Sequence, residues 1–323
     1  MGVGSRSCCP GRPGSGPQGE PPPGDLRHPR RRTGGDHVTP ATGHAVEACQ
    51  LPDDILRQIL ELLNRRFGFL FRDSFREMAR ARLARRMAEL GLDNLQDYYY
   101  RLLYDEQSEA EIEALFETLA NNETYFFREP SQIWTFAREI LQERRKARPG
   151  ARVRVWSAGC ATGEETYSLA MAVLETDPSL EGAVEIFGSD QSRKALEKAR
   201  RGIYGRFSFR SMPDGYQERY FQEAEAGRMQ VVPRVRRMVQ FGRCNLMGPA
   251  GDLPLVKFDA IFCRNVLIYF HQEARRQVIN LFHDRLNEGG YLLLGHSESL
   301  LDLSDRFEFA SLNNDVAYRR EER

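Results

Sequence analysis

The segment from Arg152 to Tyr167, RVRVWSAGCATGEETY, constrains the fold of this chain more than any other stretch. Residues typical of β-strands run into a loop of small residues with two glycines, and two glutamates open the helix that follows. A strand, a glycine-rich turn and a helix in that order build the nucleotide pocket of a doubly wound α/β sheet. The same turn also serves as an ordinary strand-to-helix connection, so this motif alone leaves ligand binding open.

The glutamates Glu164 and Glu165 narrow the class of ligand. A pyrophosphate group binds best at a helix N-terminus that carries no carboxylate. The two acidic side chains therefore argue against NAD or ATP, and they favour a nucleoside with positive charge and hydroxyl groups, such as S-adenosylmethionine. The next predicted strand, 183–189, ends at Asp190, where an acidic side chain typically binds ribose hydroxyls.

Length and composition limit the class of protein further. The 323 residues are enough for two domains with a large core. The formal net charge of zero gives the chain as a whole no charge signature of nucleic-acid binding and leaves only local basic patches for that role. The sequence has no run of 18 apolar residues and no apolar N-terminal region, so we expect neither membrane insertion nor a signal peptide. Six scattered cysteines without a C-x-x-C pair indicate a cytoplasmic protein that has no metal site.

The first part of the chain divides into a tail and a helical region. Residues 1–46 are rich in Gly, Pro, Ser and Arg and nearly lack large apolar side chains, so we expect a disordered tail. Residues 47–120 carry apolar side chains at helical spacing. This pattern predicts a small all-α domain with helices near 53–63, 73–90, 95–103 and 108–119.

The second predicted helix is strongly basic. Between Arg57 and Arg86 the sequence has nine arginines and three acidic residues. Arg82, Arg85 and Arg86 lie on the side of this helix opposite its apolar stripe. Such a row is either a solvated helix face or a docking face for an acidic partner helix, and the residues alone leave both interpretations open.

Residues 121–323 predict a doubly wound, Rossmann-like sheet. A buried strand at 258–263 ends at Arg264 and Asn265, and another at 292–295 ends in Gly-His-Ser-Glu. Polar side chains thus follow three strands, at the sheet edge where such folds bind ligands. We also expect a small β subdomain inserted at about 213–241, and a C-terminal antiparallel hairpin formed by 307–310 and 316–319.

Five motifs between about residues 50 and 320 resemble one family. They are NNETYFFRE, VWSAGCATGEETYSLAM, GSD with KARRGIYG downstream, FDAIFCRNVLIYF and GGYLLLGHSES. Together they resemble the CheR-type chemotaxis receptor methyltransferases, which use S-adenosylmethionine to esterify glutamates of bacterial chemoreceptors. The resemblance implies a protein-glutamate O-methyltransferase that releases S-adenosylhomocysteine and acts on the acidic methylation helices of a receptor. We expect it to be a monomer.

The resemblance also implies roles for single residues. Arg128 and Tyr269 would lie nearest the transferred methyl group, and Glu165 and Asp190 would together hold the methionine amino group and the ribose hydroxyls. The residues expected to bind the cofactor are Asn122, Thr124, Arg128, Gly159, Glu165, Asp190, Asn245, Leu246, Arg264 and Asn265. The basic face formed by Arg82, Arg85 and Arg86 would dock the receptor.

This chain departs from the family pattern at two places. Thr166 stands where a proline is common. The β insertion looks short, so we do not expect it to bind a peptide tether at the receptor terminus.

Two other classes of function compete with this interpretation. One is a cofactor-binding regulatory module of a signalling system that does not methylate a receptor, and the presence of Arg128 and Tyr269 argues against it. The other is a small-molecule or nucleic-acid methyltransferase on the same sheet, which fold alone does not exclude. The sequence lacks the Asn/Asp-Pro-Pro-aromatic motif of amino-group methylation.

Overall fold

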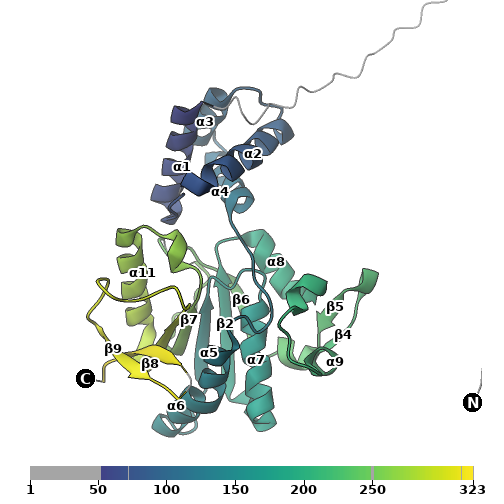
Figure 1. Ribbon diagram of the computed structural model, residues 1–323, viewed down its shortest axis with the longest axis vertical. Coiled ribbons are helices and arrows are strands. Elements are labelled where there is room, and N and C mark those ends of the chain that lie inside the picture. The colour runs from purple at the N-terminus through teal and green to yellow at the C-terminus, as the bar shows by residue number, and fades with distance from the viewer. Residues whose placement is uncertain (1–51, 72, 249–250, 314, 323) are drawn as a thin grey trace, which may run out of the picture. The chain divides into compact units, whose positions relative to one another are not determined.

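The computed structural model describes residues 52–71, 73–248, 251–313 and 315–322 (Figure 1). The predicted tail, residues 1–46, lies outside the described residues. No helix within the described ranges combines the length and the apolar character needed to cross a membrane.

The helical region contains four helices, as predicted. They are α1 (Asp53–Phe67), α2 (Asp73–Glu89), α3 (Leu95–Tyr104) and α4 (Ser108–Leu119). Glycine ends the first one: Gly68 follows α1 at φ 74°, a left-handed conformation that side chains other than glycine rarely adopt. The side chain of Asn94 caps α3 by accepting a hydrogen bond from the backbone N–H of Gln96. The apolar stripes of all four helices meet in one core, which includes Ile59, Leu63, Leu83, Met87, Tyr98 and Leu115.

In the rest of the described chain, seven strands form a Rossmann-like sheet. They are β1 (Val153–Ala158), β2 (Val184–Asp190), β6 (Val239–Arg243), β7 (Phe258–Cys263), β8 (Leu286–Leu294), β9 (Phe307–Ser311) and β10 (Val316–Arg320). Their order is β6-β2-β1-β7-β8-β10-β9. The first five pair in parallel, and β10 is antiparallel to both of its neighbours. The reversal of strand order beside β1 is the point where such sheets bind ligands, and the predicted C-terminal hairpin is confirmed.

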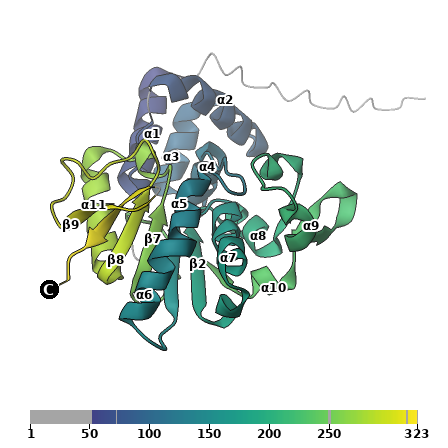
Figure 2. The ribbon, with the colours of Figure 1, turned by 60° about the horizontal axis from the view of Figure 1, so that its bottom comes forward.

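Helices cover both faces of this sheet because successive side chains of a strand point in opposite directions. Val155 of β1 packs into a core shared with α5 (Pro130–Thr135), α6 (Leu141–Ala147) and α7 (Glu164–Thr176). A π-helical turn, 136–140, joins α5 to α6. The next residue, Trp156, packs on the opposite face against α11 (Gln272–Arg285). Figure 2 shows α5, α6 and α7 over one face of the sheet.

The predicted limits of the β subdomain, 213–241, are wrong at both ends. The small sheet is built from β3 (Ile203–Tyr204), β4 (Phe221–Glu223) and β5 (Met229–Val231), with α9 (Tyr216–Tyr220) between β3 and β4. The segment near 239–243, assigned to this insertion from the sequence, is β6 of the main sheet and pairs with β2. The physical reason is Pro233, which opens a helical turn, α10 (Pro233–Arg236), between β5 and β6 and so separates β6 from the small sheet.

Candidate functional site

One cavity opens at the carboxyl ends of β1, β2 and β7. Its volume is about 1140 Å³, including space open to solvent, and the helical region contributes Phe67, Phe69 and Phe116 to its lining. All eleven residues predicted to bind the cofactor or to act in catalysis line this cavity. They are Asn122, Thr124, Arg128, Gly159, Glu165, Asp190, Asn245, Leu246, Arg264, Asn265 and Tyr269. The fold therefore brings together side chains that lie far apart in the sequence.

The glycine-rich loop is clamped to the end of β2. The backbone N–H groups of Gly159 and Cys160 donate to the Ser189 carbonyl over 2.8 and 2.9 Å. Gly159 has φ 77°, and a Cβ there would come within 2.5 Å of a methyl carbon of Val266. Only glycine fits this position, because any side chain would collide with the loop that follows β7.

Asp190 ends β2 and joins two loops at the cavity wall. Its Oδ2 accepts the backbone N–H of Ala161 and its Oδ1 accepts that of Ser192, each over 2.9 Å. Burial raises the pKa of the Asp190 carboxyl, and these N–H donors oppose the shift. Two carboxylate oxygens offer about four acceptor positions, so these bonds do not exhaust the capacity of Asp190 to accept a ligand hydroxyl.

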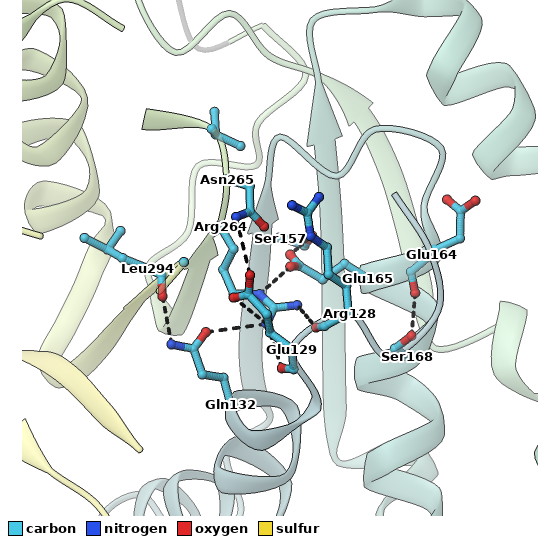
Figure 3. Close-up of polar contacts among 12 residues, drawn as sticks. Arg128, Glu129, Gln132, Ser157, Glu164, Glu165, Ser168, Arg264, Asn265 and Leu294 are labelled. Carbon is cyan, nitrogen blue, oxygen red and sulfur yellow. Dashed lines mark hydrogen bonds and ion pairs between the residues drawn. The ribbon is translucent and has the colours of Figure 1, made fainter. Parts of the chain in front are cut away.

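Arg264, at the end of β7, is the centre of a buried polar cluster (Figure 3). Its side chain is 2% exposed, and its Nε donates to Glu165 Oε2 over 2.7 Å. Its two terminal nitrogens donate to the carbonyl oxygens of Glu129 and Arg128 over 2.9 and 2.8 Å. The other oxygen of Glu165 accepts the hydroxyl of Ser157 over 2.7 Å. Arg264 therefore ties the segment before α5 to the sheet. Its N–H groups hold this segment in position, and its side chain also lines the cavity.

Glu298 holds the turn after β7, and sequence reasoning missed it. Its carboxylate accepts backbone N–H groups from Gly295, Asn265, Val266 and Ile268 over 2.8 to 3.1 Å. Asn265 has φ 58°, which aims these donors at one carboxylate. Burial raises the pKa of Glu298, and the four N–H groups oppose that shift. The GGYLLLGHSES motif contains this residue, but nothing in the motif indicates that its partners are backbone atoms.

Tyr269 is fixed on this turn from three sides. Its ring stacks on Phe69 with centroids 5.8 Å apart and planes 6° apart. Its carbonyl accepts the backbone N–H of Leu70 over 2.6 Å, and its hydroxyl accepts the side-chain amide of Asn121 over 3.3 Å. The helical region and the segment after α4 thus both orient the tyrosine, and its hydroxyl stays at the cavity.

Arg128 lines the cavity from the segment that precedes α5. Its guanidinium donates to the carbonyl of Glu123 over 3.2 Å and lies 5.8 Å from the ring centroid of Tyr125. Its own carbonyl is held by Arg264. The backbone at Arg128 is therefore anchored, while its side chain makes only one weak hydrogen bond and is available to an anion.

Asn245 lies at the junction of β6 with the helical region. Its side-chain nitrogen donates to the carbonyl of Arg66 over 3.2 Å, and its Oδ1 accepts the backbone N–H of Met247 over 3.0 Å. Leu246 follows it in the lining. On the opposite wall, Asn122 and Thr124 are half-buried lining residues of the segment between α4 and α5.

The prediction that Arg86 belongs to an exposed row of arginines on α2 is wrong. This guanidinium donates to both oxygens of Glu111 on α4, over 2.9 and 2.6 Å, and the Glu111 side chain is only 7% exposed. Tyr98 also donates its hydroxyl to Glu111 over 2.6 Å. Hydrogen bonding to Glu111 raises the pKa of Arg86, and burial raises the pKa of Tyr98. Arg86 thus belongs to the interior of the helical region.

Arg82 also has partners inside the molecule. It donates to three carbonyl oxygens at the end of α4, those of Thr118, Leu119 and Ala120, over 3.1 to 3.2 Å. Of the predicted docking set, Arg85 presents most of its side chain to solvent, 74% of it, beside Glu89. The sequence spacing did not reveal that α4 packs against the flank of α2 that carries Arg82 and Arg86.

The described cysteines lie in buried positions. Cys160, Cys244 and Cys263 are all reduced, and burial raises the pKa of each thiol. Within the described ranges, no group of three or more His, Cys, Asp or Glu side chains is arranged to hold a metal ion.

The order of the strands and the cavity at their carboxyl ends define a Rossmann-like methyltransferase. The family model "CheR methyltransferase, SAM binding domain" matches residues 122–316, and "CheR methyltransferase, all-alpha domain" matches residues 54–120. The chain belongs to the CheR family of S-adenosylmethionine-dependent methyltransferases.

Curated relatives agree with this assignment over most of the chain. Chemotaxis protein methyltransferase 2 of Vibrio cholerae is 36% identical over 252 residues, which cover 78% of this chain and 87% of the relative. The chemotaxis protein methyltransferase of Escherichia coli is 36% identical over 264 residues, covering 81% and 90%. That of Vibrio parahaemolyticus is 35% identical over 277 residues, covering 84% and 98%.

The side chains that line the cavity fit S-adenosylmethionine. Glu165 and Asp190 place two carboxylates in the lining, which suits an ammonium group, a sulfonium and ribose hydroxyls. Phe67 and Leu246 offer apolar surface to a base. The first turn of α7 carries Glu164 and Glu165, and the neighbouring cations Lys198 and Arg264 each lie against one of these carboxylates, so this helix start does not suit a pyrophosphate.

Proposed function

We propose that this protein transfers the methyl group of S-adenosylmethionine to glutamate side chains of chemoreceptor cytoplasmic helices, with S-adenosylhomocysteine as the second product. The observation that carries the proposal is the presence of Arg128 and Tyr269 in one cavity of the region that matches the family's SAM binding domain. The curated relatives are named as chemotaxis protein methyltransferases, which supports a receptor as substrate.

The reaction needs little proton chemistry. A glutamate side chain has an ordinary pKa of about 4.3, so at neutral pH it is already an anionic nucleophile. The bound cofactor supplies an electrophilic methyl group on a sulfonium. The protein then has to hold the carboxylate oxygen in line with that methyl group, which is mainly a matter of orientation.

Arg128 and Tyr269 are the groups we assign to this task. Arg128 would pair with the substrate carboxylate through charge-assisted hydrogen bonds, since its guanidinium otherwise makes one long bond to the Glu123 carbonyl. Tyr269 would position the carboxylate or the methyl group with its hydroxyl. The stacking of Tyr269 on Phe69 supports this role, because it holds the tyrosine ring in place before substrate arrives.

The cofactor would be held by the remaining lining residues. Glu165 and Asp190 would share the methionine amino group and the ribose hydroxyls, and Asn245 and Leu246 would receive the adenine. Asn122 and Thr124 would close the cavity from the junction segment. Gly159 would allow close approach of the loop, and Arg264 and Asn265 would support the methionine end.

The receptor would dock on the helical region, residues 47–120. Receptor methylation helices are acidic in this family, and complementary charge favours encounter between partners. Arg85 is the exposed member of the predicted basic face and carries this part of the proposal. We propose that the protein acts as a monomer in the cytoplasm.

Methyl transfer from labelled S-adenosylmethionine to a purified receptor cytoplasmic fragment tests the proposal, with base-labile ester counted as product. We expect label that falls when receptor glutamates are changed to alanine. At saturating cofactor, Arg128→Ala should lower turnover by about a hundredfold, since it removes a charged contact to the reacting group.

Arg152→Ala is the matched control, because Arg152 pairs with Glu185 at the amino ends of β1 and β2, whereas the cavity lies at the carboxyl ends of the strands. Normal turnover in Arg128→Ala would contradict the assigned role. Cofactor binding without ester on any receptor of the same cell would favour a regulatory module instead.

A further inference from the structure

A second arginine, Arg210, contacts the same aromatic ring as Arg128, that of Tyr125. Arg210 places its guanidinium carbon 3.7 Å from the ring centroid of Tyr125, and that of Arg128 lies 5.8 Å from the same centroid. The two guanidinium carbons are therefore at most about 9.5 Å apart, the sum of those distances, with an aromatic ring that both cations contact.

The backbone around Arg210 is anchored to the site. It follows the 3₁₀ turn Arg206–Phe209, and the carbonyl of Ser208 in this turn accepts the backbone N–H of Phe126 over 2.9 Å. The hydroxyl of Ser208 donates to Glu164 Oε1 over 2.9 Å. Two hydrogen bonds thus hold the turn to the cavity-lining segment and to the start of α7, so Arg210 has a defined place near Arg128.

Arg210 forms an ion pair with Glu123 of the same chain. The Arg210 guanidinium donates to Glu123 Oε1 over 2.8 Å, with 39% and 67% of the two side chains exposed. Exposed ion pairs contribute little free energy, typically less than about 1 kcal/mol, because water screens them. An incoming carboxylate can therefore replace Glu123 at small cost.

Exposed apolar surface adjoins this arginine. Phe207 is 86% exposed, and its carbonyl accepts a hydrogen bond from Arg210 over 3.2 Å. A large apolar side chain next to two cations suits an amphipathic helix that carries acidic residues on one side and apolar residues beside them.

We propose that Arg210 binds a second acidic side chain of the substrate helix, one helical turn from the glutamate that is methylated, and that Glu123 fills this place until substrate arrives. The inference rests on the proposed function, in which Arg128 pairs with the reacting carboxylate. Residues three or four apart on a helix have Cβ atoms about 5–6 Å apart. Two carboxylates at that spacing, each on a flexible side chain, reach two guanidinium groups separated by no more than the distance above.

Steady-state methylation of a receptor cytoplasmic fragment tests this assignment. Arg210→Ala should raise the KM for the fragment about fivefold, since it removes one exposed charge contact. Turnover at saturating fragment and the affinity for S-adenosylmethionine should not change. Arg234→Ala is the matched control: Arg234 forms a similar exposed pair with Glu181 over 2.8 Å, just before β2 begins, at the opposite edge of the sheet.

Glu123→Gln separates substrate binding from mere support of the turn. If Glu123 competes with the substrate, removing its charge lowers the KM for the fragment; if it only holds Arg210 in place, the KM rises. Changing the receptor acid one turn from the methylated glutamate to glutamine should raise the KM of the wild-type enzyme and leave that of Arg210→Ala unchanged.

The possible results divide clearly. An unchanged KM in Arg210→Ala, or a raised KM in Glu123→Gln, overturns the role of Arg210 while ester formation by the wild-type enzyme still supports the proposed function. Absence of ester with wild-type enzyme overturns both.

Discussion

Two arginines hold the two ends of the segment 121–128, which lines the cavity. Arg82 of α2 donates to the carbonyl oxygens of residues 118–120, where α4 ends, and Arg264, just after β7, donates to those of Arg128 and Glu129. Both side chains thus satisfy backbone oxygens at a chain junction. They differ in their surroundings: Arg264 is buried and paired with Glu165, whereas Arg82 is half-buried and donates to three carbonyl oxygens.

The difference indicates how each end of the segment is stabilised. Removing a buried charge leaves its partners without hydrogen bonds in a region that water does not reach. Removing a half-buried one lets water take its place. The end near β7 should therefore be rigid and costly to disturb, and the end near α4 should be adjustable. An adjustable end beside the helical region would suit the proposed docking of a receptor on that region.

The first prediction concerns the rigid end. Arg264→Ala should lower the free energy of unfolding by about 3–5 kcal/mol, because it leaves the Glu165 carboxylate and two carbonyls unpaired. Urea unfolding measures this loss. Arg154→Ala is the control, since Arg154 also pairs with a glutamate, Glu185, but its side chain is 35% exposed. Equal losses in the two variants would contradict the assignment of Arg264 to a buried cluster.

The second prediction concerns the adjustable end. Arg82→Ala should lower the free energy of unfolding by about 1–2 kcal/mol, because water can replace its bonds to the α4 carbonyls. The affinity for S-adenosylmethionine, measured by calorimetry, should fall as well, since the freed end leads directly into Asn122 and Thr124. Arg85→Ala, one turn away on α2, serves as the control for both measurements. An unchanged cofactor affinity would show that α4 alone fixes the segment.

Sequence patterns predicted the cavity because the motifs lie at strand ends. Glu165, Asp190 and Arg264 each stand at or just beyond the carboxyl end of a strand or its following loop, and parallel strands bring those ends to one edge. Their meeting follows from topology, so no knowledge of side-chain contacts was needed.

Other features depend on contacts that no motif encodes. Glu298 accepts hydrogen bonds from backbone N–H groups, and Phe69 of the helical region stacks on Tyr269, which is far away in the sequence. Neither partner is visible in the sequence. The role of Arg82 depends on how α2 packs against α4. The segment of β6 was assigned to the inserted subdomain because it is a short β-rich stretch close to another one, and the helical turn at Pro233 between them was not recognised.

The third prediction tests whether charge itself stabilises the site, by using the neighbour of Glu165. Glu164 is 1% exposed and accepts hydroxyl hydrogen bonds from Thr162 and Ser208, with Lys198 3.9 Å away. Burial raises the pKa of Glu164 above its ordinary value of 4.5. A raised folded-state pKa means that its contribution to stability is fully present below pH 4.5 and is lost as pH rises through the folded value.

Glu164→Gln should therefore stabilise the protein at neutral pH, by less than the losses above, because the amide can accept from one hydroxyl and donate to the other without a buried charge. The stability difference between variant and wild type should shrink as pH falls and vanish below about pH 4.5, where the wild-type carboxyl is protonated in both states. Urea unfolding at several pH values measures it. A difference that stays constant with pH would mean that lost hydrogen bonds, rather than charge, dominate at this position.

The smallest effect on stability is expected at Arg85, and it sharpens the contrast with Arg82 on the same helix. Arg85→Ala should change the free energy of unfolding by no more than about 0.5 kcal/mol, because its side chain is 74% exposed and its pair with Glu89 is long, at 3.9 Å. If Arg85 docks the receptor, the KM for the receptor fragment should rise about two- to threefold at low salt, and this difference should fade at high salt as the charge is screened. A KM equal to that of the wild type at low salt would show that Arg85 of α2 is not part of the docking surface. A loss of stability comparable to that of Arg82→Ala would mean that both arginines support the fold.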